Sequence, residues 1–177
     1  MKRPIVFITL FVALTFVFIA CGKNENTNTG NGHVEIYLLD SFKTIGYTNQ
    51  IDEKTIVMKA GPLVAYSDFL SYDPDTYTFK ISNTAREVIK SLEHSVHGLA
   101  FAIKANNVLI YTGYFWPGYS SASCDWVVID PMGLSLDNKL MVELGYPGLM
   151  EGQVILDRRN DQRILDIFAG DDKLIKK

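Results

Sequence analysis

The sequence is poor in cysteine and has no excess of positive charge. Only two of its 177 residues are cysteine, Cys21 and Cys124, so at most one disulfide can form. Lysine and arginine number 17 against 20 acidic residues, so the chain lacks the basic field that attracts nucleic acid. It also lacks a glycine-rich phosphate loop and a G-x-S-x-G nucleophile motif. We therefore expect neither a nucleic-acid partner nor a cofactor.

The only long apolar run lies at the N-terminus. Lys2 and Arg3 precede an apolar stretch at residues 5–19, and Ala20 stands directly before Cys21. Basic residues, a short apolar stretch and a small residue form the order of a secretory signal peptide. A spanning helix needs about 20 apolar residues, so this run is too short for one. The pattern predicts export and removal of residues 1–20.

The residues around the predicted cleavage site resemble a known processing signal. Phe18-Ile19-Ala20-Cys21 is similar to the lipobox of bacterial lipoproteins, with Phe18 where that family usually has Leu. The resemblance covers only the signal peptide and implies that the Cys21 thiol is acylated, giving a membrane anchor. An unmodified Cys21 after ordinary secretory cleavage is the alternative. Gly22 stands where enteric bacteria read Asp as an inner-membrane retention mark, so the resemblance favours the outer membrane, with periplasmic or surface display left open.

The cysteine is followed by a polar tract and then by the domain. Residues 22–32 read GKNENTNTGNG and contain nothing apolar to bury, as expected of a flexible tether of roughly 20 Å reach. Removal of Lys2 and Arg3 changes the 17 basic residues to 15, so the mature net charge is about −5. Acylation of Cys21 would leave Cys124 unpaired, and stability must then come from an ordinary core. Residues 33–177 are long enough for one core, which predicts a single domain.

Alternating apolar residues predict a domain rich in strands. Strands are expected at residues 34–38, 55–59, 63–66, 77–81, 99–105, 108–115, 126–129, 140–144 and 154–156. A single helical turn is expected at 67–70. Residues 73–76, Asp-Pro-Asp-Thr, fit a type I turn.

Two helices and one hairpin complete the prediction. Thr84 and Glu87 have the spacing of a capping box and open a helix expected to run to residue 97. A C-terminal helix is expected from near residue 160 to before Gly170. Asn106-Asn107 predicts a two-residue type I′ turn, which sets Ala105 opposite Val108 and, further along, Phe101 opposite Thr112. Together these elements predict an α+β fold with a mixed, mostly antiparallel sheet, one central helix and a C-terminal helix.

Residues 67–116 carry a second, faint resemblance. A strand at 77–81, a helix, and Leu99-Ala100-Phe101-Ala102-Ile103 before a hairpin turn resemble the periplasmic head region of the SecD protein-export subunit. The stretch contains no catalytic motif, and the chain lacks the transmembrane helices of that family. The resemblance implies a shape, and an accessory role in protein export or envelope assembly follows from it by analogy alone.

The segment 111–126 is the most unusual in the chain, because it holds six aromatic side chains with several serines among them around Pro117-Gly118. Rigid rings and adaptable hydroxyls suit contact with a protein or glycan. The candidate binding residues are Tyr114, Phe115, Trp116, Tyr119, Ser120 and Ser121. The alternative interpretation is that these rings fold back over the sheet as core, with Trp126 buried on its strand.

Three further groups are weaker candidates. His94 and His97 lie three residues apart, but nothing supplies the further ligands of a zinc site, so we expect no metal and solvated histidines. Cys124 beside a histidine would make a thiol nucleophile, although a merely unpaired thiol is the simpler interpretation. Asp125 and Asp130 have the residue type of a glycosidase pair, but their odd spacing on a strand points them to opposite faces.

The sequence therefore supports three hypotheses of different classes. The leading one is a non-enzymatic lipoprotein of the cell envelope that binds a protein or glycan partner through the aromatic segment. The second is an envelope hydrolase that uses Cys124 or Asp125 with His97. The third is the accessory factor implied by the SecD resemblance. Oligomeric state is left open.

Overall fold

The computed structural model describes residues 32–176. The predicted signal peptide, Cys21 and most of the tether lie outside the described residues. The elements in chain order are β1 (Val34–Ser41), β2 (Val57–Met58), the 3-10 turn η1 (Tyr66–Asp68), β3 (Phe69–Asp73), β4 (Thr78–Ile81), α1 (Asn83–Lys90), β5 (Leu99–Ala105), β6 (Val108–Phe115), β7 (Cys124–Ile129), the 3-10 turn η2 (Pro131–Ser135), β8 (Lys139–Tyr146) and α2 (Gln162–Gly170). No helix among these residues is long and apolar enough to cross a membrane.

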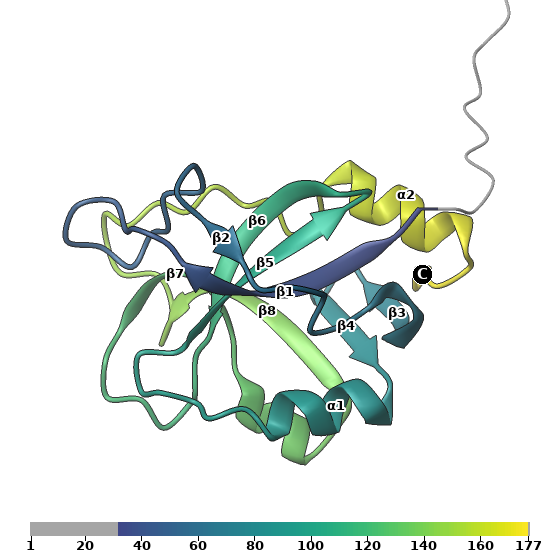
Figure 1. Cartoon of the computed structure of the whole chain (residues 1–177), viewed down its shortest axis with the longest axis horizontal. Coiled ribbons are helices and arrows are strands. Elements are labelled where there is room, and N and C mark those ends of the chain that lie inside the picture. The colour runs from purple at the N-terminus through teal and green to yellow at the C-terminus, as the bar shows by residue number, and fades with distance from the viewer. Residues whose placement is uncertain (1–31, 177) are drawn as a thin grey trace, which may run out of the picture.

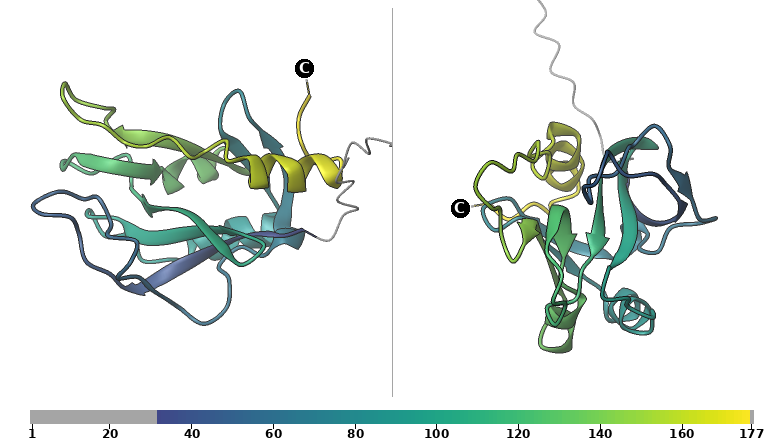
Figure 2. Two further views of the ribbon diagram at one scale, coloured as in Figure 1. Left: turned by 90° about the horizontal axis from the view of Figure 1, so that it is seen from above. Right: turned by 90° about the vertical axis from the view of Figure 1, so that its left-hand side faces the viewer.

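The strands form one sheet, which confirms the predicted α+β class. Within the described residues the sheet has eight strands in the order β2-β1-β5-β6-β7-β8-β4-β3. The β6–β7 pair is parallel and the other neighbouring pairs are antiparallel. In Figure 1, α2 lies above the strands and α1 below them, and the side view in Figure 2 keeps the two helices apart. In the strand order given above, β6 and β7 lie at the centre of the sheet.

The β5–β6 hairpin has the predicted turn but not the predicted register. Asn106 and Asn107 both adopt positive φ, at 49° and 65°, as a type I′ turn requires, and Ala105 pairs with Val108. A bulge follows, because Lys104 pairs with Leu109 but Ile103 pairs with Tyr111. Phe101 consequently faces Gly113 instead of Thr112. A Cβ at residue 113 would lie 2.6 Å from the Phe101 ring, so the tight packing there requires glycine.

The central helix is shorter than predicted and begins at a different cap. Ser82, not Thr84, is the N-cap residue of α1, and its hydroxyl oxygen accepts the Ala85 N–H at 3.1 Å. The helix ends at Lys90, not residue 97. The Ser91 hydroxyl donates to Val88 O, and the His94 ring lies 3.0 Å from Ile89 O. These side chains satisfy carbonyls that a continued helix would have used.

Pairing with distant strands determines which segments form strands, and it explains where the prediction from the local sequence pattern is wrong. The predicted helical turn at 67–70 is η1 followed by β3, which pairs with β4. The predicted strand at 55–59 is reduced to β2, and 63–66 contributes only the isolated bridge between Ile36 and Val64. Residues 154–156 are not a strand, although their exposure alternates about buried Ile155.

The C-terminal helix α2 lies where the sequence predicted it and closes an aromatic core. Asp161 is its N-cap and accepts the Arg163 N–H at 3.0 Å. Phe168 is fully buried on α2, and its ring centroid lies 5.6–5.9 Å from those of Tyr66, Phe69, Tyr72 and Phe79. These rings join α2 to β3 and β4 and fix the segment that precedes the helix.

Candidate functional site

The predicted aromatic binding surface is mostly core. Tyr114 and Phe115 are buried, and Trp116 is 1% exposed. The Phe115 ring packs on Phe101 at 5.0 Å, and Tyr114 meets Trp116 edge-on at 6.0 Å. The prediction that these three rings form a contact surface is wrong, because β6 lies between β5 and β7 with both of its faces covered.

The rest of that segment is accessible in part. Tyr119 is 58% exposed and Ser121 is exposed, whereas Ser120 is buried. The Ser120 hydroxyl donates to Val96 O at 2.7 Å, and the Tyr119 hydroxyl lies 3.3 Å from His94 O. These bonds join the loop after β6 to the loop before β5, so Ser120 has a structural role.

The residues proposed for a hydrolase are not brought together. Cys124 is 1% exposed, and burial raises the pKa of its thiol to about 12. The Asp125 carboxylate accepts the Asn49 N–H at 2.7 Å. Within residues 32–176 no hydrogen bond or ion pair joins exposed His97 to either residue, and no group of three or more His, Cys, Asp and Glu residues is placed to hold a metal ion.

Cys124 is expected to resist thiol reagents in the folded protein. A thiol with a pKa near 12 is a thiolate in only about one molecule in ten thousand at pH 8, and burial also blocks access. The measurement is thiol titration of the full-length Cys21→Ser variant, in which Cys124 is the only cysteine, with and without guanidinium chloride. We expect one reactive thiol in denaturant and almost none without it. Rapid labelling of the folded protein at pH 7 would restore Cys124 as a candidate nucleophile.

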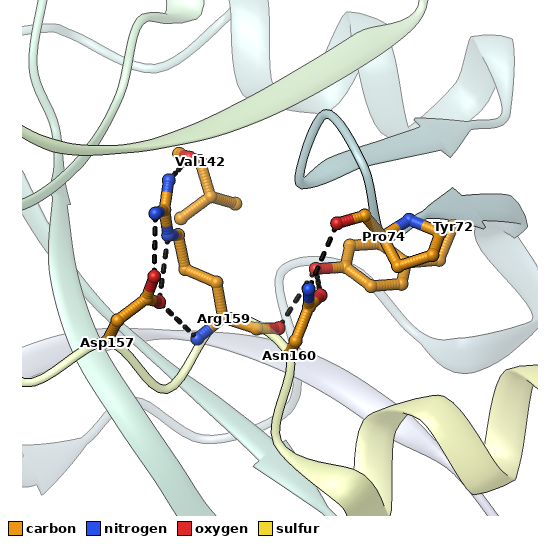
Figure 3. A network of polar contacts seen from close by, with 6 residues as sticks. All are labelled: Tyr72, Pro74, Val142, Asp157, Arg159 and Asn160. Carbon is orange, nitrogen blue, oxygen red and sulfur yellow. Dashed lines mark hydrogen bonds and ion pairs between the residues drawn. The ribbon is translucent and has the colours of Figure 1, made fainter.

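The structure instead gathers polar side chains around Arg159, in the segment that leads into α2 (Figure 3). The Arg159 guanidinium donates to both carboxylate oxygens of Asp157, at 2.9 and 2.7 Å, and to Val142 O on β8 at 3.0 Å. Its central carbon lies 3.5 Å from the centroid of the Tyr77 ring. Arg159 therefore joins its own segment to β8 and to the β3–β4 turn.

The electrostatics keep the Asp157–Arg159 pair ionised. Hydrogen bonds from Arg159 hold the pKa of Asp157 below its usual value, against the opposing effect of burial. Burial alone would lower the pKa of Arg159, but the bonds to Asp157 raise it. Only 12% of the Arg159 side chain is exposed, so its charge is compensated inside the protein instead of being offered to an anion.

The neighbouring residues fix the backbone of this segment. The Tyr72 hydroxyl lies 2.9 Å from Arg159 O and 2.8 Å from Asn160 Oδ1. The Asn160 amide donates to Pro74 O at 3.0 Å (Figure 3). The neighbouring Arg158 forms an ion pair with Glu53 at 2.5 Å. The segment is therefore held at several points.

A groove of about 330 Å³ runs along β8 beside Arg159. Its lining residues are Thr76, Tyr77, Met141, Val142, Glu143, Leu144, Gly145, Pro147, Gly148 and Arg159. On the β4 side, β8 is paired only at Lys139–Met141, and the Val142 N–H donates to Tyr77 O at 3.0 Å. The next part of β8 has no strand beside it on that side among the described residues, which leaves an open sheet edge.

Sequence reasoning missed both the groove and the Arg159 cluster. The one signal that could have indicated them is the run Asp157-Arg158-Arg159-Asn160-Asp161, five consecutive charged or amide side chains before a predicted helix. No protein-family model, no curated protein and no solved structure matches the chain. The site must therefore be interpreted from its own geometry.

Proposed function

We propose that the chain is an envelope lipoprotein, anchored by lipid on Cys21, whose domain binds a protein partner and is not an enzyme. The lipobox-like residues and the polar tract after them support the anchor, and Gly22 favours the outer membrane. The His33 N–H donates to Asn106 Oδ1 at 3.0 Å, and a Cβ at Gly32 would lie 2.5 Å from Ile167. The tether thus enters the domain between α2 and the β5–β6 turn.

The open edge of β8 is the observation that carries the binding role. Unpaired strand edges are sites at which other chains associate, and native proteins usually protect them. The yellow-green loop after β8 lies at the opposite end of the domain from the entry of the tether (Figure 1). A partner can therefore reach this edge while the domain is anchored. The buried Cys124 thiol argues against the hydrolase hypothesis.

Reversal of one exposed charge at the groove tests this function. Glu143 lines the groove, is exposed and forms no ion pair within the described residues. We expect Glu143→Lys in the full-length protein to reduce cross-linking to an envelope partner by about tenfold, because a like charge now faces the partner's basic groups. Glu93→Lys makes the same change of net charge on an exposed loop and should leave cross-linking unchanged. Equal capture by both variants, or no captured protein, would contradict the proposal.

A further inference from the structure

The open edge of β8 presents main-chain groups of defined direction. In an antiparallel ladder, successive residues direct their N–H and C=O groups alternately to the two neighbouring strands. Val142 directs both of its groups to the β4 side, where they meet Tyr77 O and the Arg159 side chain. Leu144, two residues on, directs its N–H and C=O to the same side. No strand of the described chain pairs with it there.

The two ends of the groove limit what it can hold. At one end the stacked Tyr77 and Arg159 side chains close the edge at Val142. At the other end the chain turns back on itself, since a Cβ at Gly145 would lie 2.9 Å from Gly148 O. Between these two ends the unpaired part of β8 is residues 143–145, which at about 3.3 Å per residue is roughly 10 Å of strand. This length accommodates about three residues of an extended peptide.

The outward face of β8 beside the groove indicates the side chains of the occupant. Glu143 and Met141 are exposed on this face, while Leu140 and Val142 point into the core. The nearby Asp157 carboxylate is already compensated by Arg159. Glu143 is therefore the uncompensated charge at the groove, and a basic side chain on a neighbouring strand would pair with it.

From these observations we propose that the groove binds an extended peptide segment of a partner protein, which adds to β8 as an antiparallel strand in line with β4. The peptide exchanges two hydrogen bonds with Leu144 and places a basic side chain beside Glu143. The Arg159 guanidinium already donates a hydrogen bond to Val142 O, so the added strand ends before Val142. This inference rests on the proposed binding function and specifies its ligand as a β-strand addition.

A random peptide library displayed on phage tests the inference without the natural partner. The library is selected on the full-length protein, on Glu143→Lys and on the charge-matched control Glu93→Lys. We expect enriched peptides to lack proline, to alternate in polarity and to carry Lys or Arg at one shared position. They should be lost on Glu143→Lys and kept on Glu93→Lys. A synthetic copy of an enriched peptide should slow amide hydrogen exchange at Leu144 by at least about tenfold.

Each other result overturns the inference. An absence of enriched peptides, or peptides insensitive to Glu143→Lys, would exclude strand addition here, even if a whole partner protein is still cross-linked. Exchange at Leu144 that stays fast in the presence of bound peptide would exclude it too. Protection of Leu144 without peptide would assign the groove to another occupant. Protection independent of protein concentration would assign it to residues 21–31 of this chain, and concentration-dependent protection to a second copy.

Discussion

Replacement of Trp116 by alanine is expected to lower the free energy of unfolding by about 3–5 kcal/mol, because the ring is buried and its removal leaves a large cavity. The indole packs edge-on against Tyr114 and lies at the end of β6, where the Trp116 N–H donates to Ile129 O at 2.9 Å. The main-chain bond survives the substitution, so the loss reports the side chain. Denaturation of the full-length protein in guanidinium chloride measures it.

Tyr119→Ala is the matched control for this prediction. Its ring belongs to the same segment but is largely exposed, and the hydroxyl makes a single bond to His94 O. We expect its effect on unfolding to stay within about 1 kcal/mol. A Trp116→Ala protein with an unchanged denaturation midpoint would mean that the indole belongs to a surface, as the binding interpretation of the sequence predicts.

Substitution of Cys21 by serine is expected to move the protein from the membrane fraction to the soluble fraction. Acyl chains contribute about 0.8 kcal/mol of membrane binding per buried methylene, and serine cannot receive them through a thiol. The first measurement is fractionation of cell envelopes. The second is the mass of the mature wild-type protein, which should exceed that of the polypeptide by the mass of the lipid.

The control for the anchor is Cys124→Ser. This change also removes one of the two cysteines, but at a buried position on β7, and it should leave the protein in the membrane fraction. Cys21→Ser protein that still sediments with membranes, or wild-type protein with the unmodified mass, would overturn the lipoprotein proposal. Neither result would alter the interpretation of the groove.

Elements defined by short-range chemistry were predictable from the sequence. The Asn106-Asn107 turn needs only two residues that tolerate positive φ, and both adopt it. Helix α2 needs a capping Asp161 and an apolar stripe, and it forms within two residues of the predicted start. The error at the start of α1 has a cause in the tertiary structure. Ser82 and Thr84 both suit an N-cap, and the choice fell to Ser82, whose hydroxyl also donates to Asp68 at 2.6 Å.

Features that depend on which strands lie beside a given strand were not predictable from the sequence. The aromatic residues of β6 suit a binding loop as well as a core, and only the position of β6 between β5 and β7 buries them. Strand β3 lacks a clear pattern and forms because β4 pairs with it. The bulge beside Ile103 shifts the hairpin register in a way that the two turn residues do not encode.

The sequence by itself determined the α+β class, the hairpin turn and the C-terminal helix, because each depends on residues close together in the chain. The export signal also depends on neighbouring residues, and it stays a prediction. Only the tertiary structure decided the groove. Arg159 meets Val142 across 17 residues, and Tyr77 contacts Arg159 from the distant β3–β4 turn. Such a site is created because β8 continues past Met141, which pairs with the first residue of β4. The point where a strand loses its neighbour is set by the packing of the whole sheet.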